Sequence, residues 1–155
     1  MDKTIALAIS VGLLSATWAG TAHIFGLISW VGFVSWACFY AAGGGNAGLL
    51  KTLPSNFTGA LYGFLIAYIP GILHFPFVSF IITTIICMII VVQSKWSVLS
   101  FVPGTFAGSA IYFGNDFDLS TTIYSMLIGA ILGYISEKGG LYLAKIKKVK
   151  FFRRK

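Results

Sequence analysis

Residues 76–93 read PFVSFIITTIICMIIVVQ and contain no charged side chain. A helix needs roughly 20 mostly apolar residues to cross the hydrocarbon core of a bilayer, and this stretch approaches that length. The rest of the chain has the same character, since 57% of its 155 residues are hydrophobic and only 10% are charged. A soluble domain carries about 25% charged residues. So few charges cannot cover a water-exposed surface, and the composition indicates an integral membrane protein.

Five further apolar segments accompany this one, and clusters of Gly, Pro, Asn, Asp and Ser separate them. The alternating pattern of a membrane β-barrel is absent. Backbone groups in lipid must find partners within their own segment, so each segment is predicted to be a helix. The predicted fold is an all-α membrane protein with about six transmembrane helices, at residues 4–22, 25–42, 55–73, 76–93, 98–114 and 119–136. A single transmembrane domain would occupy residues 1–140, followed by a basic cytoplasmic tail over residues 141–155.

Positive charges set the predicted orientation. Six helices place both termini and two of the loops on one side, together with Lys3, Lys51 and Lys95. Cytoplasmic loops carry such an excess of Lys and Arg, so both termini are predicted to be cytoplasmic. The other eight of the eleven Lys and Arg residues lie from Lys138 onward, seven of them in the predicted tail over residues 141–155. This tail should contact anionic lipid headgroups, and because no folded domain accompanies it, nucleic-acid binding is not predicted.

Ionisable side chains are missing from the middle of the predicted helices. Proton relays, carriers of charged substrates and intramembrane hydrolases all need such groups, so no enzyme activity, metal or cofactor is predicted. A Na⁺ site built from carbonyls and hydroxyls stays open. The Gly-rich stretch 43–52 is predicted to be a flexible loop, because it lacks the Gly-Lys step of a phosphate loop. Asp118 is predicted to cap the sixth helix. Asn56 starts a glycosylation sequon but is expected on the cytoplasmic side and unmodified.

Two stretches of sequence recur. Ser29-Trp30-Val31-Gly32-Phe33 resembles Ser100-Phe101-Val102-Pro103-Gly104-Thr105 if Pro103 is one inserted residue. Gly59-Ala60-Leu61-Tyr62-Gly63 resembles Gly129-Ala130-Ile131-Leu132-Gly133. The recurrence predicts two three-helix repeats, about 1–73 and 76–136, and an odd number of helices inserts the second copy upside down. Gly32 and Gly104 would then be equivalent, and the second and fifth helices would cross near the centre.

The second and fifth helices carry the candidate site because small and hydroxyl residues concentrate there. One interpretation is a narrow polar path, in which hydroxyls and freed carbonyls replace water around a solute. The other is close helix packing through small residues, and both can hold at once. The fifth helix is predicted to start or kink at its proline, which cannot donate a backbone hydrogen bond. The candidate solute-binding residues are Ser29, Gly32, Ser35, Ser100, Pro103, Gly104, Thr105 and Ser109.

The run Leu99-Ser100-Phe101-Val102-Pro103-Gly104-Thr105-Phe106, together with Leu27-Ile28-Ser29-Trp30-Val31-Gly32-Phe33, resembles a known family. It is similar to the YcdZ-like bacterial inner-membrane proteins, which are classed as a domain of unknown function. The resemblance covers most of residues 5–144. It implies an inner-membrane location and a multi-helix fold, and it implies no substrate and no catalytic residue.

The leading functional hypothesis is a passive channel or facilitator for a small uncharged polar solute. The alternative is a non-transporting membrane scaffold or accessory subunit, and a membrane enzyme comes third. Three Gly-xxx-Gly pairs, at residues 59/63, 104/108 and 129/133, offer faces on which helices approach closely. These pairs predict a homo-oligomer.

Overall fold

The structure is all-helical within the part of the chain that it describes. A computed structural model describes residues 2–152, with side chains placed for residues 2–146. Three short 3₁₀ turns, η1 (Ala22–Phe25), η2 (Gln93–Lys95) and η3 (Ser97–Leu99), interrupt the connections between the α-helices. The α-helices are α1 (Lys3–Thr21), α2 (Ser29–Ala41), α3 (Gly45–Ile72), α4 (Val78–Val92), α5 (Val102–Gly114) and α6 (Leu119–Phe152).

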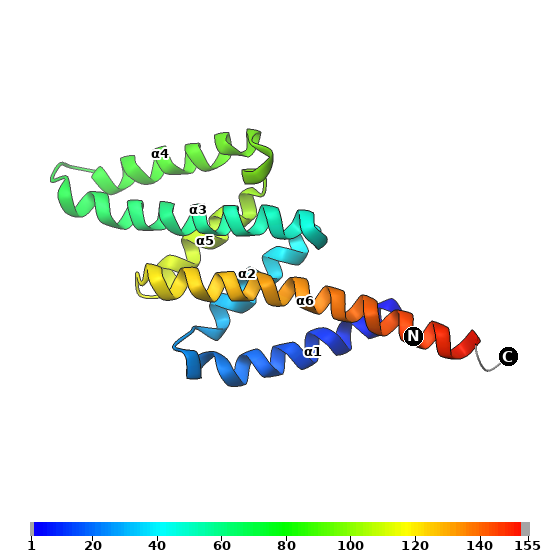
Figure 1. Ribbon diagram of the computed structural model, residues 1–155. Coiled ribbons are helices and arrows are strands. Elements are labelled where there is room, and N and C mark those ends of the chain that lie inside the picture. Colours follow the sequence, from blue (N-terminus) through cyan, green and yellow to red (C-terminus); the bar gives the residue numbers. More distant parts are fainter. Residues whose placement is uncertain (1, 153–155) are drawn as a thin grey trace.

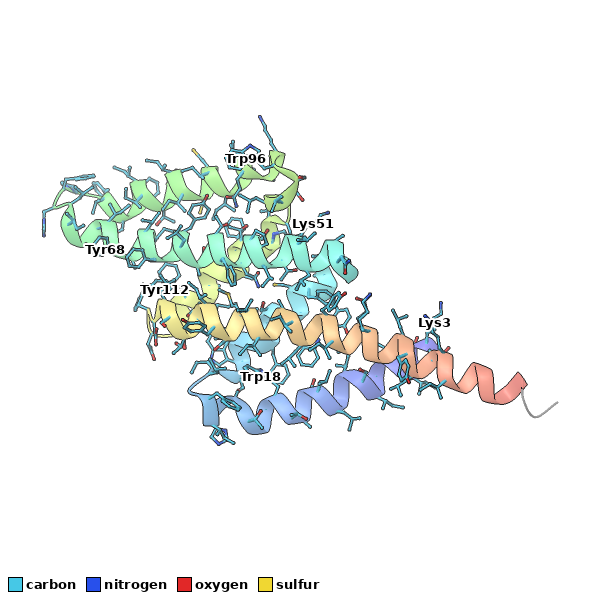
Figure 2. All side chains as sticks on the ribbon, in the orientation of Figure 1. Lys3, Trp18, Lys51, Tyr68, Trp96 and Tyr112 are labelled. Atoms are coloured by element: carbon cyan, nitrogen blue, oxygen red, sulfur yellow. The ribbon has the colours of Figure 1, made fainter. Side chains whose placement is uncertain are left out.

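The long helices form a row, and the two short ones cross behind it (Figure 1). In this row α6 lies between α1 and α3, and α4 packs on the other side of α3. The short helices α2 and α5 pack mainly on α6 and α3 respectively. Both ends of the described chain lie at one end of the row, and Figure 2 places Lys3, Lys51 and Trp96 towards that end. The chain therefore reverses direction at each connection, as the alternating topology requires.

Three stretches are long and apolar enough to cross a membrane by themselves: Lys3–Phe25, Val78–Lys95 and Leu119–Ile146. The other three helices differ from the six similar spans that the sequence predicts. Because α2 and α5 have 13 residues each, they are about 20 Å long, against a hydrocarbon core of about 30 Å. They cross the longer helices and pack mainly on α6 and α3. In contrast, α3 has 28 residues.

The prediction of a flexible loop over residues 43–52 is wrong, because α3 already begins at Gly45. The Glu137 carboxylate explains this early start. It accepts a hydrogen bond of 2.7 Å from the Gly45 N–H, and so caps the N-terminus of α3 from α6. Gly44 approaches the same carboxylate with a φ of 67°, a conformation that favours glycine. Pro54 lies inside this helix, and buried residues of α3 both precede and follow it along the chain.

The last helix also differs from its predicted boundary at residue 136. It continues without a break through Gly139 and Gly140, because these glycines pack against Ser10 and Leu7 of α1. The helix reaches Phe152, so the expected tail begins within it. The basic residues of the tail from 147 onward lie outside the side chains that the structure describes.

Two predicted helix starts are confirmed. The fifth helix begins at Val102 and carries Pro103 in its first turn, where a missing N–H costs least. Asp118 caps the sixth helix, since its side chain accepts hydrogen bonds from the N–H groups of Ser120 and Thr121 at 2.9 and 3.1 Å. These two backbone hydrogen bonds, and one with the Thr121 side chain, lower the pKa of the Asp118 carboxyl.

Glycines bring the short helices into backbone contact with the long ones. A β-carbon on Gly59 of α3 would overlap the carbonyl oxygen of Thr105 in α5. A β-carbon on Gly129 of α6 would likewise overlap the carbonyl oxygen of Gly32 in α2. Members of the three Gly-xxx-Gly pairs are thus used within one copy of the chain. They do not form the outward faces on which the prediction of a homo-oligomer depended.

We expect Gly129→Ala to lower the thermal unfolding temperature strongly, because the added methyl group forces α2 and α6 apart. Overpacking of this kind costs about 1–3 kcal/mol or more. Gly12→Ala is the matched control, since nothing lies within 4 Å of its β-carbon position on α1. That control should be neutral or slightly stabilising. Unfolding followed in detergent measures both, and equal behaviour of the two variants would contradict the crossing described here.

Candidate functional site

A chain of hydrogen bonds links three helices at the centre of the molecule. The Ser35 hydroxyl of α2 donates to the Met126 carbonyl of α6 at 2.7 Å. The Asn56 side chain of α3 donates from Nδ2 to the same Ser35 oxygen at 2.8 Å. All three residues are completely buried. Buried polar groups of this kind normally have partners, and here each donor has one.

Next to this chain, three buried side-chain oxygens have no hydrogen-bond partner: Thr52 Oγ1, Ser55 Oγ and Asn56 Oδ1. They lie on one face of α3, because residues three and four apart are neighbours on a helix. Asn56 Oδ1 lies 3.2 Å from the position that a β-carbon on Gly104 would take, beside the first turn of α5. We call Thr52, Ser55 and Asn56 the α3 cluster. Leaving such a group unsatisfied costs about 1–3 kcal/mol, so the cluster is a place where a bound molecule would be stabilised.

The matching positions of α6 are satisfied. Seventy residues after Thr52 and Ser55 stand Thr122 and Ser125, both fully buried. Thr122 Oγ1 accepts a hydrogen bond of 3.0 Å from the Asn115 side chain. Ser125 Oγ accepts one of 3.0 Å from the backbone N–H of Ile28, just before α2. The same residue types therefore have partners in one half of the molecule and lack them in the other.

A second polar link lies between α3, α4 and α5. Gln93, at the end of α4, is buried, and its Oε1 accepts a hydrogen bond of 2.8 Å from the Tyr62 hydroxyl. Its Nε2 donates to Thr105 Oγ1 at 3.1 Å. Tyr62 and Gln93 also line a groove of about 420 Å³ between α3 and α4, together with Trp96. This link holds the end of α4 against α5.

The predicted site residues divide into three groups. Ser35 and Gly104 meet at Asn56 and so belong to the surroundings of the α3 cluster. Gly32, Thr105 and Ser109 are buried at helix contacts, where the Ser109 hydroxyl donates to the Gly59 carbonyl at 2.6 Å. Ser29 is half-buried, and its carbonyl accepts a hydrogen bond from the Trp18 indole. Ser100 and Pro103 are exposed, and the Ser100 hydroxyl donates to the Ser97 carbonyl.

The buried oxygens without partners lie on α3, not on the second and fifth helices, so we take the α3 cluster as a candidate site. The sequence singled out Asn56 only as part of a glycosylation sequon and did not single out Thr52 or Ser55. A signal for them was present, because the spacing Thr-x-x-Ser-x-x-x-Gly-Ala-x-x-Gly occurs at residues 52–63 and again at 122–133. Including the Thr and Ser positions in the repeat would have shown that polar residues recur together with the glycines.

These features define a helical integral membrane protein with a buried, uncharged polar centre. The chain belongs to the DUF1097 family, described as "Protein of unknown function", whose model matches residues 8–141. It is 33% identical over 146 residues to "Inner membrane protein YcdZ" of Escherichia coli (strain K12), covering 93% of this chain and 90% of that protein.

Two further relatives are similar over nearly their whole length. "Inner membrane protein YcdZ" of Salmonella typhimurium (strain LT2) is 34% identical over 146 residues, covering 93% of this chain and 91% of that protein. "Uncharacterized protein YahC" of Escherichia coli (strain K12) is 31% identical over 157 residues, covering 94% of this chain and 95% of that protein. No solved structure matches this chain.

We expect Thr105→Val to lower the thermal unfolding temperature, because it leaves the buried Gln93 amide without its acceptor. The loss should correspond to about 1–3 kcal/mol. Thr105→Ser keeps the hydroxyl and should recover most of it. Thr84→Val is the matched control, since the hydroxyl of the half-buried Thr84 donates to the Phe80 carbonyl of its own helix. An equal shift in Thr84→Val would rule out this role for the Gln93 link.

Proposed function

We propose that this protein is a passive facilitator for a small uncharged polar solute in the inner membrane, and that the solute binds at the α3 cluster. The single observation that carries the proposal is the set of three buried oxygens without partners. A membrane interior offers little water to satisfy such groups, so a polar solute that reaches them is stabilised there. The inner-membrane names of the relatives support the location.

The surroundings favour an uncharged solute. The carboxylate of Glu137 in α6 accepts a hydrogen bond from the Gly45 N–H at the N-terminus of α3. The polar side chains of the cluster itself are two hydroxyls and one amide. A charged solute in a low-dielectric site needs an opposite charge or a metal, and these neutral groups supply neither.

An inverted-repeat architecture is part of the proposal, and matched contacts support it. The contact of Gly59 with the Thr105 carbonyl has a counterpart in the contact of Gly129 with the Gly32 carbonyl. In both cases a glycine of a long helix lies on a backbone oxygen of a short one. Transporters built from inverted repeats place their solute sites where the two halves meet.

A second pair of contacts has the same spacing. Gly63 lies against the Tyr112 ring, and Gly133 lies against the Phe39 ring. Equivalent positions are then 70 residues apart in α3 and α6, and 73 residues apart in α2 and α5. This register makes Gly32 equivalent to Thr105, one position later than the predicted equivalence with Gly104. The second and fifth helices were also predicted to cross each other near the centre. Instead, α2 packs mainly on α6 and α5 packs mainly on α3, so each lies on a long helix of the opposite half.

Solute flux into proteoliposomes tests the function. We expect the wild-type protein to raise urea and glycerol flux above that of protein-free vesicles. Asn56→Leu and Thr52→Val should each lower it by roughly tenfold, because a hydrogen bond of about 1.4 kcal/mol corresponds to that factor. Thr58→Val is the matched control on the same helix, since the Thr58 hydroxyl donates to the Pro54 carbonyl and lies outside the cluster.

Two results would contradict the proposal. Equal losses of flux in Thr58→Val and Thr52→Val would show that the flux does not depend on the cluster. Wild-type vesicles that conduct neither solute would instead favour the alternative, a non-transporting scaffold or accessory subunit.

The cytoplasmic location of both termini is also part of the proposal. It draws support from Lys3 and Lys51, which lie towards the end of the molecule where the described chain starts and finishes (Figure 2). A C-terminal alkaline phosphatase fusion should be inactive and a green fluorescent protein fusion bright, because only the cytoplasm folds the second reporter. An active phosphatase fusion would reverse the orientation. Binding of the basic tail to anionic headgroups and self-association also remain proposals.

A further inference from the structure

The protons of the central hydrogen-bond chain fix the orientation of the Asn56 amide. A serine hydroxyl has one proton to donate, and Ser35 gives it to the Met126 carbonyl at 2.7 Å. Towards Asn56 the Ser35 oxygen can therefore only accept. The group that lies 2.8 Å from it must be the NH₂ of Asn56, because the amide oxygen has no proton to give.

Since the NH₂ faces Ser35, the amide oxygen must face the other way. Asn56 Oδ1 lies beside Gly104 in the first turn of α5 and has no partner. Glycine lets the amide oxygen and the Phe101 ring approach α5 closely, because a β-carbon at position 104 would lie 3.2 Å from the oxygen and would overlap the ring. Oδ1 is therefore the atom of the Asn56 side chain that has no hydrogen-bond partner, and it can only accept.

The two hydroxyls of the cluster do not restrict the class of ligand. The Thr52 and Ser55 hydroxyls can each donate or accept, so they adapt to whatever binds. Only Asn56 Oδ1 imposes a requirement, which is a hydrogen-bond donor. A cation would also suit three neutral oxygens, but the cluster lies beside the first turn of α5, where the helix dipole is positive. A neutral N–H or O–H group donates a hydrogen bond to Asn56 Oδ1 without bringing a full positive charge to the start of α5.

We propose that the α3 cluster selects small neutral solutes that donate a hydrogen bond to Asn56 Oδ1, and that Ser35 is the positioning residue that enforces this choice. Ser35 acts through the amide, because it holds the NH₂ and so aims the oxygen at the solute. The inference rests on the proposed function for its role in transport, whereas binding at Asn56 can be measured without transport. A site built to bond one group rejects analogues that lack it far more strongly than an apolar pocket does.

Acetamide and acetone are suitable probes, because they have nearly the same shape and differ by NH₂ against CH₃. The chain contains three asparagines, at 46, 56 and 115, so ¹⁵N-asparagine labelling gives few side-chain amide signals. The Asn56 signal in nanodiscs is assigned by its loss in Asn56→Leu. We expect acetamide to shift it, and acetone and Na⁺ to leave it unchanged at the same concentration. In proteoliposomes, excess urea should compete with acetamide flux and excess acetone should not.

Ser35→Ala removes the group that orients the amide while leaving Asn56 in place. We expect this variant to lose the preference for acetamide over acetone by roughly tenfold or more, in both the amide signal and the competition. Ser109→Ala is the matched control, because this buried hydroxyl donates to the Gly59 carbonyl and not to the Asn56 side chain. The control should keep the wild-type preference, which also separates positioning from a general loss of a buried hydroxyl.

The outcomes separate the two proposals. If the wild-type protein conducts urea but acetone or Na⁺ shifts Asn56, or Ser35→Ala keeps its preference, the inference is overturned and the facilitator function stands. If the protein conducts no solute but acetamide still shifts Asn56 selectively, the facilitator function is overturned and the donor-selective site stands. If acetamide does not shift Asn56, the inference is overturned, and if no solute crosses either, both proposals are overturned.

Discussion

The fold depends on contact between glycines of the long helices and backbone carbonyls of the short helices. The Gly59 contact with Thr105 joins α3 to α5, and the Gly129 contact with Gly32 joins α6 to α2. Helices in lipid gain little from the hydrophobic effect on associating, so they depend on close packing and interhelical hydrogen bonds. The approach at Gly59 provides both, because the neighbouring Gly59 carbonyl also accepts the Ser109 hydroxyl. Larger side chains at these glycines would remove the close packing.

Close approach of the backbones also determines where polar side chains can be buried. The crossing of α3 with α5 places Asn56 between Gly104 and Ser35, where its amide reaches α2. The side chain then bridges helices that are distant in sequence. Because such groups are costly to bury without partners, their presence in an apolar protein points to a role in binding. The hydrogen bonds of Gln93 have a structural role in comparison, since both ends of its amide have partners.

The difference between the two halves is as informative as their similarity. Position 56 is asparagine where position 126 is methionine, and position 35 is serine where position 108 is glycine. Both polar residues thus occur in the first half, and the second half keeps small or apolar residues at the matching places. The Met126 carbonyl nevertheless takes part, because it accepts the Ser35 proton. If the halves are inverted copies, the binding chemistry has been concentrated in one of them while the packing has been kept in both.

The sequence by itself determined the membrane environment and the all-helical fold, since composition and the length of apolar runs suffice for both. It also located local features such as the Asp118 cap and the helix start at Pro103, because capping and proline chemistry act within a few residues. Only the tertiary structure decided that α3 starts at Gly45, because its cap comes from Glu137, 92 residues away along the chain. The same reason explains the candidate site: an asparagine in an apolar sequence becomes a candidate binding group only when folding buries it and directs one of its two ends to a partner.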